Sequence, residues 1–256
     1  MSLPDPWRRL AALTPARIGI GRAGSGLGTR ETLRFALAHA RARDAVHAEL
    51  DAEALATALA GLGLDSLQVA SRAAGRASYL LRPDLGRSLA TESRALLEGR
   101  SERGCDIGLV IADGLSASAV EAHAASFAAA FLPLARQKGW SLSPAVIVSQ
   151  GRVAIGDEIG VLLGARLTLL LVGERPGLSC PDSLGLYITH APRPGRTDGE
   201  RNCVSNIHAG GLRPEAAAAR AAWLIGAAFA RGLSGVALKD ESAGAGPSQR
   251  LESDTG

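Results

Sequence analysis

The pattern of apolar residues changes near Gly104, and this change constrains the fold more than any other feature of the sequence. Beyond it, short and nearly continuous apolar runs alternate with segments of helical periodicity. Such runs are typical of strands buried on both faces, and their alternation with helices predicts a parallel sheet. We therefore expect a Rossmann-like α/β unit with a largely parallel sheet. Its predicted strands are Ile107–Ala112, Ala145–Ser149, Leu167–Val172 and Leu184–Thr189, and its predicted helices are Ser116–Leu134, Asp157–Leu163 and Pro214–Arg231.

The chain before residue 96 instead repeats apolar side chains at the spacing of an amphipathic helix. One helix is predicted from Thr29, which can cap it, to His47. A second is predicted over Ala52–Leu62 and a third from Pro83, and no strand is expected in this region. We thus predict a helical N-terminal domain (1–95), an α/β domain (96–240) and a disordered tail (241–256) rich in Ser, Gly and charged residues.

Cysteine content and charge narrow the classes of function. Three cysteines without a C-x-x-C pair argue against a disulfide framework or a zinc site, and they fit a reducing cytoplasm. All but two of the 28 basic residues are arginine, but they are scattered among 25 acidic residues, so we expect no nucleic-acid partner. The longest strongly apolar run, Leu167–Gly173, is too short to cross a bilayer, and residues 1–10 lack a signal-peptide stretch. We expect a soluble, cytoplasmic protein without a membrane partner.

The segment Gly19–Gly24 matches the G-x-G-x-x-G pattern of dinucleotide-binding loops. In such loops the backbone approaches a pyrophosphate at the end of a buried strand, and an acidic residue follows at the end of a second strand. Here only Ala16–Ile20 precedes the glycines, and Asp44 falls within a predicted helix. We interpret the segment as an arginine-bearing loop that lies along a partner, with a nucleotide-dependent oxidoreductase as the alternative.

Three polar loops follow the predicted strands: Asp113–Ser116, Gly173–Gly177 and Arg201–Asn206. Ligands of open α/β sheets bind beyond the carboxyl ends of the strands. The loops therefore predict a binding surface, and ordinary turns are the alternative. The adjacent carboxylates Asp157 and Glu158 point apart on a helix, so we interpret them as solvated or capping residues rather than an acid/base pair.

These loops belong to an ordered set of segments that resembles the small subunit (light chain) of ethanolamine ammonia-lyase. The set covers about residues 17–211, and its order is far more specific than any one segment. Its members are Arg22–Gly24, Leu37–His47, Tyr79–Arg87, Val110–Ala117, Gly156–Gly160, Gly173–Gly177 and Cys203–His208.

The resemblance implies an adenosylcobalamin-dependent lyase that converts ethanolamine to acetaldehyde and ammonia by a radical route, for which the cofactor supplies the chemistry. In this family the substrate pocket lies in the barrel of a large catalytic subunit, and the small subunit closes over the cobalamin within a higher-order hetero-oligomer. Val153, Glu174 and Cys203 match the cofactor contacts of the small subunit, and the resemblance implies no catalytic residue or metal ligand in this chain. It also implies a cytoplasmic location, with a bacterial microcompartment as the alternative.

The chemistry of these three residues suits a corrin ring. The corrin rim carries neutral amides, so a site that holds it needs hydrogen-bond acceptors and donors rather than a strong field. Glu174 offers a charged acceptor, which forms a stronger hydrogen bond than a neutral one. Val153 and Cys203 offer backbone groups and small apolar contacts, and a small buried residue is the alternative for Cys203.

His208 lies in a segment, Asn206–Gly211, that is similar to a D-x-H-x-x-G motif. In some cobalamin proteins the histidine of this motif binds cobalt. A metal-binding histidine is usually oriented by a carboxylate, and Asn206 stands in its place. We interpret His208 as a polar loop or interface residue. A purely structural subunit that never touches the cofactor is the second alternative to the lyase subunit.

Overall fold

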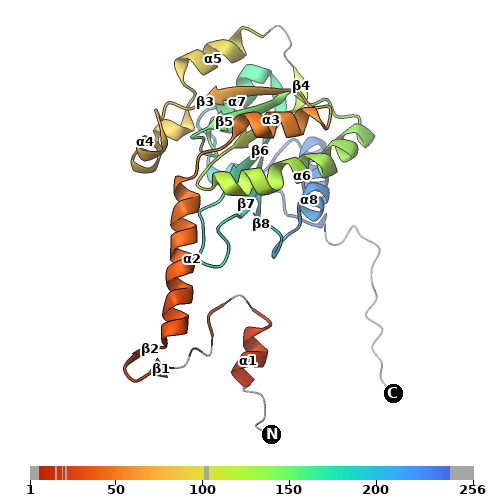
Figure 1. Ribbon diagram of the computed structural model, residues 1–256. Helices are drawn as coiled ribbons and strands as arrows, with labels where there is room; N and C mark the ends of the chain where they lie inside the picture. The colour runs from red at the N-terminus through yellow and green to blue at the C-terminus, as the bar shows by residue number, and fades with distance from the viewer. Residues whose placement is uncertain (1–5, 15, 19, 21, 101–103, 243–256) are drawn as a thin grey trace, which may run out of the picture.

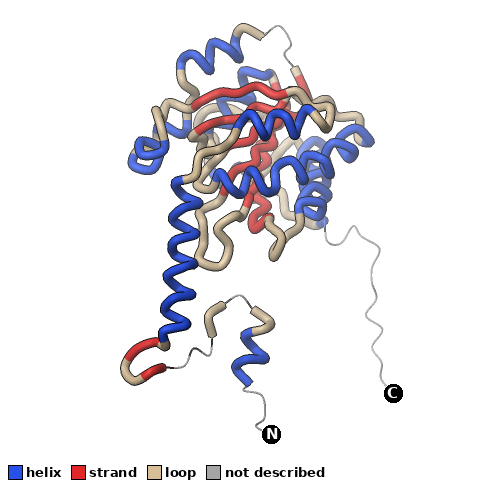
Figure 2. The backbone as a smooth tube through the Cα atoms, viewed as in Figure 1, coloured by secondary structure: helices blue, strands red, loops and turns tan. Residues whose placement is uncertain are grey.

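The computed structural model describes residues 6–14, 16–18, 20, 22–100 and 104–242, which form an α/β body from which one long helix projects (Figure 1). Figure 2 shows the strands of the body stacked side by side among the helices. The helices are α1 (Pro6–Ala11), α2 (Thr29–His47), α3 (Ala52–Ala60), α4 (Arg76–Leu81), α5 (Thr91–Glu98), α6 (Ala117–Gln137), α7 (Ile155–Leu163) and α8 (Pro214–Arg231), with 3-10 turns η1 (Leu85–Arg87) and η2 (Asp198–Glu200). The strands are β1 (Arg22–Ala23), β2 (Gly26–Leu27), β3 (Ser66–Ala70), β4 (Cys105–Ala112), β5 (Ala145–Ser149), β6 (Ala165–Gly173), β7 (Leu184–His190) and β8 (Asn202–Ile207).

Six of these strands form one sheet in the order β3-β5-β4-β6-β7-β8. The strands β3, β5, β4 and β6 run parallel to their neighbours, whereas β7 and β8 extend the sheet as antiparallel strands. The predicted α/β class with a largely parallel sheet is confirmed, and each of the four predicted strands is present.

Helices cover both faces of the central strands, which explains their continuous apolar runs. Ile107, Leu109 and Ile111 of β4 pack into a core that includes residues of α3, α6 and α8. Val110 and Ala112 of the same strand pack on the opposite face, against residues of α5 and α7. Because successive side chains of a strand point to opposite faces, a strand between two helical layers is apolar at nearly every position.

The two edge strands contradict the sequence analysis. We expected no strand before residue 96, but β3 pairs in parallel with β5. We expected a loop over Arg201–Asn206, but most of that segment is β8, which pairs with β7. Of β8, Val204 and Ile207 are buried and the polar residues face outward. An edge strand with one covered face has no continuous apolar run, which is why the apolar pattern missed both. In addition, β3 belongs to the predicted N-terminal domain but lies in the sheet of the predicted α/β domain.

The predicted N-terminal helices are confirmed in part. α2 begins at Thr29, although Gly28 rather than Thr29 occupies the cap position, and Asp51 caps α3. The helix expected from Pro83 is wrong, because α4 ends before it and α5 begins at Thr91. The chain between them turns tightly against α4, since a side chain at Gly86 would come within 2.9 Å of the Tyr79 ring.

The helix α2 projects from the body and leads at its far end to β1, β2 and α1 (Figure 1). Within α2, Ala45 near the body is buried. Leu33, Phe35 and Leu37 farther out are 64%, 47% and 52% exposed. We call the part of α2 that carries the exposed residues Leu33, Phe35 and Leu37 the α2 arm.

By length and composition, α6 is apolar enough to cross a membrane, but half of its apolar window is buried inside the structure. Its Phe127 and Phe131 are buried and stack with ring centroids 5.6 Å apart. The helix packs against α8 and β6, which is the position of a core helix. From residue 243 onward, the tail predicted to be disordered lies outside the described residues.

Candidate functional site

The carboxyl ends of β4, β5 and β6 open onto a cleft of about 290 Å³, as expected for a ligand site of an open α/β sheet. Its walls come from α4, from the loops after these strands, and from β7. The lining residues are Tyr79, Gly114, Leu115, Arg152, Val153, Val172, Gly173, Glu174, Arg175 and Tyr187.

Two glycines bring the loops after β4 and β6 into contact. The Leu115 N–H donates to the Gly173 carbonyl at 2.9 Å. Gly114 has a left-handed φ of +58°, and a side chain there would come within 2.2 Å of the same carbonyl. A side chain on Gly173 would meet the Ser116 carbonyl at 2.0 Å. The two loops can therefore form one continuous cleft wall because both positions are glycine.

Asp113 holds the floor of the cleft together. Its side chain is 1% exposed and accepts hydrogen bonds from the Gln150 N–H at 2.9 Å and the Gly151 N–H at 3.1 Å. The Arg76 guanidinium lies 3.8 Å away and also donates to the carbonyls of Gly114 and Val46. Burial raises the pKa of Asp113, and the Gln150 N–H and Arg76 act in the opposite direction. These bonds give Asp113 a structural role and leave it poorly placed to act on a ligand.

Tyr79 forms a side wall, and two guanidinium groups lie over its ring. Arg76 is 4.9 Å and Arg152 is 4.2 Å from its ring centroid, both within the range of cation–π attraction. Its hydroxyl donates to the Gly151 carbonyl at 3.0 Å. Burial raises the pKa of Tyr79 to about 12, against the opposing effect of Arg152. The phenol is thus a neutral, fixed surface at physiological pH.

Glu174, predicted as a cofactor contact, is half-buried in the cleft wall. Its Oε2 accepts hydrogen bonds from the Ser183 hydroxyl at 2.5 Å and from the Asn206 N–H at 3.3 Å. The carboxylate lies across Gly185, where a side chain would come within 2.9 Å of Oε1. Within the described part of the chain, Oε1 receives no hydrogen bond, so one oxygen of a fixed carboxylate is available to a ligand.

The other two predicted contacts lie on different elements. Val153 precedes α7 and lines the cleft. Cys203 lies on β8, opposite Tyr187 of β7, and its thiol is partly covered beside the phenol although the residue as a whole is exposed. Burial raises the pKa of both side chains, so the thiol stays protonated at neutral pH. The structure therefore brings Val153 and Glu174 into one cleft and connects Cys203 to it through Tyr187.

Three residues of this cleft were not assigned from the sequence, namely Tyr79, Tyr187 and Arg152, whereas Arg175 lies in the predicted Gly173–Gly177 loop. One signal was available, because the chain contains only two tyrosines and both line the cleft. Tyrosine combines an apolar ring with a polar tip, which suits a surface that holds an amphipathic ligand. Arg152 had no comparable signal among the 26 arginines of the chain.

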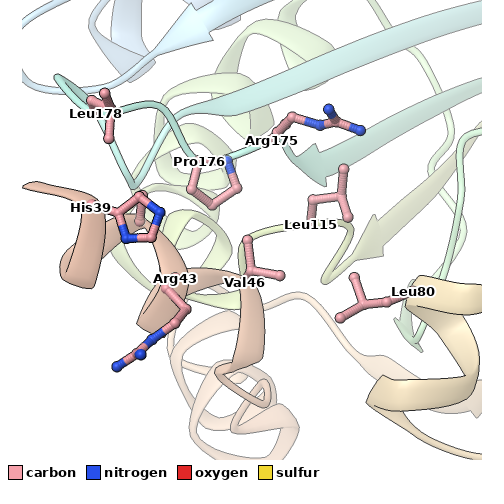
Figure 3. A pocket seen from close by; sticks show the side chains of 9 residues that line it. His39, Arg43, Val46, Leu80, Leu115, Arg175, Pro176 and Leu178 are labelled. Atoms are coloured by element: carbon pink, nitrogen blue, oxygen red, sulfur yellow. The ribbon is translucent and has the colours of Figure 1, made fainter.

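A second pocket, of about 420 Å³, lies between the C-terminal half of α2 and the loop after β6 (Figure 3). Leu115 and Arg175 line both pockets, so the two hollows are neighbours. Figure 3 shows the guanidinium of Arg43 pointing away from the apolar side chains of the pocket. The lining residues are His39, Ala42, Arg43, Val46, Leu80, Leu115, Arg175, Pro176 and Leu178.

The interpretation of Asp157 and Glu158 as solvated or capping residues is wrong, because both are buried. Asp157 forms a two-point ion pair with Arg201, with N–O distances of 2.6 and 2.7 Å. Glu158 accepts from the Leu89 N–H at 3.0 Å and pairs with Arg94. Both carboxylates tie α7 to neighbouring segments, and their partners are too distant in sequence for a local pattern to reveal.

His208 uses both ring nitrogens in local hydrogen bonds. Nδ1 accepts from the Gly210 N–H at 3.1 Å, and Nε2 therefore carries the proton that it shares with the Asn206 side-chain oxygen at 2.8 Å. This arrangement fits the interpretation as a polar loop residue. Among the described residues, no group of three or more His, Cys, Asp or Glu side chains could hold a metal ion.

The glycine-rich segment lies partly outside the described residues, which exclude Gly19 and Gly21. The described residues Ile18 and Ile20 have no strand conformation. Farther on, β1 and β2 form an antiparallel pair with Gly24 in the turn, at a φ of +65°. This local hairpin differs from the parallel strand on which a dinucleotide-binding loop depends.

Comparison with known proteins gives a consistent result. Residues 4–239 match the family described as ethanolamine ammonia-lyase light chain (EutC). The chain is 56% identical over 246 residues to the ethanolamine ammonia-lyase small subunit of Rhodopseudomonas palustris (strain BisA53), covering 94% of each chain. It is 51% identical to the small subunit of Pseudomonas fluorescens (strain SBW25), covering 99% of this chain and 92% of that one. The chain therefore belongs to the ethanolamine ammonia-lyase light-chain family.

Proposed function

We propose that this chain is the small subunit of an adenosylcobalamin-dependent ethanolamine ammonia-lyase and that its cleft forms one wall of the cofactor site. In the assembled enzyme, ethanolamine is converted to acetaldehyde and ammonia by a radical mechanism. The observation that carries the proposal is the convergence of Val153, Glu174 and, through Tyr187, Cys203 at the carboxyl edge of the sheet.

The size of the cleft supports a shared site. Pockets that enclose a drug-sized ligand measure about 300–1,000 Å³. A cleft of about 290 Å³ falls at the lower limit of that range, and a corrinoid is larger than such a ligand. This chain alone therefore covers only one side of the cofactor, and a second protein surface completes the enclosure.

The donor and acceptor groups also suit the cofactor. Glu174 Oε1 can accept from an amide N–H of the corrin rim, while Ser183 and the Asn206 N–H hold Oε2 in place. Val153 and the rings of Tyr79 and Tyr187 provide apolar surface. When bound, the cofactor supplies the radical chemistry, and the residues of this chain orient it and exclude water from one side.

The partner in this proposal is the large catalytic subunit of the enzyme, in a higher-order hetero-oligomer. The α2 arm carries Leu33, Phe35 and Leu37 in an exposed position, as expected for a surface that a partner covers. The pocket at the base of α2 borders the cleft through Leu115 and Arg175. A partner that lies along α2 would reach the open side of the cofactor site. The glycine-rich segment before α2 is proposed to lie along the same partner.

Two other functions are less well supported. A structural subunit without cofactor contact would give no reason for a fixed carboxylate with one available oxygen at the sheet edge. A nucleotide-dependent oxidoreductase would use Gly19–Gly24, but β1 and β2 form a local hairpin there. We propose the cytoplasm as the location, either free or within a bacterial microcompartment.

The test is a titration of the co-expressed complex with adenosylcobalamin, followed by acetaldehyde production and by corrinoid absorbance. Glu174→Ala is expected to raise the half-saturating concentration about 10- to 150-fold, because a hydrogen bond to a charged group contributes about 1.5–3 kcal/mol. Glu174→Gln retains an amide oxygen and is expected to raise it less. Copurification of the large subunit should be unchanged for both variants.

Glu215→Ala, on the exposed start of α8, is the matched control and should leave the titration unchanged. An unaltered half-saturating concentration for Glu174→Ala would mean that the carboxylate is an ordinary turn residue. A wild-type complex without bound corrinoid and without acetaldehyde production would refute the proposed function as a whole.

A further inference from the structure

Arg152 occupies a fixed position in the cleft wall. Its backbone N–H donates to the Gly86 carbonyl at 2.7 Å, and its guanidinium lies over the Tyr79 ring, 4.2 Å from the centroid. Its side-chain stem passes so close to Gly86 that a side chain there would lie 2.8 Å from the Arg152 Cγ. An arginine held in this way loses little conformational entropy when it binds a ligand.

The hydrogen-bond donors of Arg152 are nevertheless free. A guanidinium has five N–H donors. Within the described part of the chain, the Arg152 guanidinium makes no ion pair and no hydrogen bond, and its Nε is buried without a partner. Arg76, which also lies over the Tyr79 ring, differs from it: although its Nη2 is buried without a partner, its Nε and Nη1 donate to two backbone carbonyls and it faces Asp113. Burying an unsatisfied donor costs free energy, so a group that receives these bonds is expected in the working enzyme.

The charges of the cleft indicate the chemistry of that group. Two guanidinium groups, those of Arg152 and Arg175, line the cleft with one carboxylate, that of Glu174. One oxygen of that carboxylate, Oε2, already accepts hydrogen bonds from the Ser183 hydroxyl and the Asn206 N–H. The arginine pair therefore leaves an excess of positive charge, which neutral amides do not require. Guanidinium groups bind phosphate with two parallel hydrogen bonds, whereas a purely apolar or amide-bearing ligand would not use them.

We propose that Arg152, with Arg175 in the same cleft, binds the phosphodiester in the nucleotide loop of the cofactor. This assignment rests on the proposed function, since it concerns the same ligand. Cobalamin joins one anionic phosphodiester to a ring that bears neutral amides. The cleft has the complementary pattern, with Glu174 as an acceptor for an amide and Arg152 as a donor to the phosphate. Arg152 is thus a specificity residue that distinguishes corrinoids with a phosphate from those without one.

The experiment compares two corrinoids that differ by the phosphate: adenosylcobinamide phosphate and adenosylcobinamide. Binding to the co-expressed complex is measured by ultrafiltration and corrinoid absorbance, independently of turnover. Arg152→Met, which keeps an apolar stem beside Tyr79, is expected to weaken binding of the phosphate form about 10- to 150-fold. Binding of adenosylcobinamide should change less than about threefold. Arg152→Lys should restore part of the loss, because a point charge binds phosphate without the two-point geometry.

Arg175→Met is expected to give a smaller loss in the same direction, because Arg175 is exposed at the mouth of the cleft. Arg193→Met, an exposed arginine in the connection between β7 and β8, is the matched control and should affect neither ligand. Thermal unfolding of each complex confirms that the variants are folded.

Equal losses for both corrinoids would overturn the assignment, because Arg152 would then only support the Tyr79 wall. Unchanged binding of both corrinoids by Arg152→Met would overturn it as well and leave the proposed function intact. A wild-type complex that binds neither corrinoid would overturn the proposed function together with this assignment. A selective loss of the phosphate form would support it.

Discussion

The body of the protein and the α2 arm differ in which side chains they bury. The body buries charged side chains, whereas the arm exposes apolar ones. In the body, ionised groups are buried in pairs, as with Arg201 and Asp157, whose side chains are 2% and 1% exposed. On the α2 arm, Leu33 and Leu37 are more than half exposed. The body thus pairs buried charges such as Arg201 and Asp157 with each other, whereas the arm leaves apolar surface in water.

This difference indicates where the chain is complete and where it depends on a partner. A buried ion pair costs desolvation and is tolerated when its hydrogen bonds are made, as those of Arg201 to Asp157, Thr189 and the Arg196 carbonyl are. Exposed leucines on a projecting helix gain stability only when another surface covers them. The body is expected to fold by itself, and the apolar side chains of the arm are expected to become buried against the large subunit.

The largest expected effect concerns the body. Arg201→Met removes the partner of Asp157 and leaves a buried carboxylate uncompensated. The free energy of unfolding should fall by about 3–5 kcal/mol. Urea unfolding of the purified chain, followed by circular dichroism, measures the loss.

The control for this prediction removes both charges. Arg201→Met combined with Asp157→Leu should recover most of the lost stability, because an apolar pair of similar volume avoids the desolvation cost. If the double variant is less stable than Arg201→Met alone, the loss of stability does not come from an uncompensated buried charge. The contrast between the body and the arm is then weaker than we describe.

An intermediate effect is expected on the arm. Replacing Leu33 and Leu37 by glutamate should change the free energy of unfolding by less than about 0.5 kcal/mol, as for other exposed positions. Association with the large subunit should weaken by at least about tenfold, since each leucine contributes roughly 1.5–3 kcal/mol when it becomes buried. Copurification and analytical ultracentrifugation measure the association.

The wild-type chain without its partner provides the reference for this prediction. It should show no lyase activity and only weak cobalamin binding, because it covers one side of the cofactor. Tight cobalamin binding by the isolated chain, or normal assembly of the glutamate variant, would show that the arm and the cofactor site do not depend on a partner in this way.

Features that depend on the residues of one segment were predictable from the sequence. Features that depend on contacts between distant segments were not. The strands β4, β5 and β6 were predictable because both of their faces are covered, which makes them apolar at nearly every position. The edge strands β3 and β8 have one covered face and were missed. At the site, the Asp113–Ser116 and Gly173–Gly177 loops were predictable from chain order, whereas the third predicted loop, Arg201–Asn206, is mostly the strand β8. The pairing of Asp157 with Arg201, 44 residues apart, was not, because nothing local distinguishes these residues from exposed ones.

The smallest effect expected concerns Glu200, a partly exposed charge of the body, and it separates burial from pairing as the cause of stability. The Thr197 N–H, followed by Arg196, lowers the pKa of Glu200 from its ordinary value of 4.5 to about 2. A carboxylate with a lowered pKa in the folded state contributes stability above pH 4.5, and this contribution is lost as the pH falls from about 4.5 to 2.

Glu200→Gln should therefore be less stable than the wild type at pH 7, and the difference should shrink across this window. Because solvent screens the partly exposed Glu200 carboxylate, the difference should be far smaller than that for Arg201→Met. Urea midpoints between pH 7 and pH 2.5, with Glu215→Gln as the control, measure it. A difference that stays constant down to pH 2.5 would assign the effect to side-chain packing rather than to the charge.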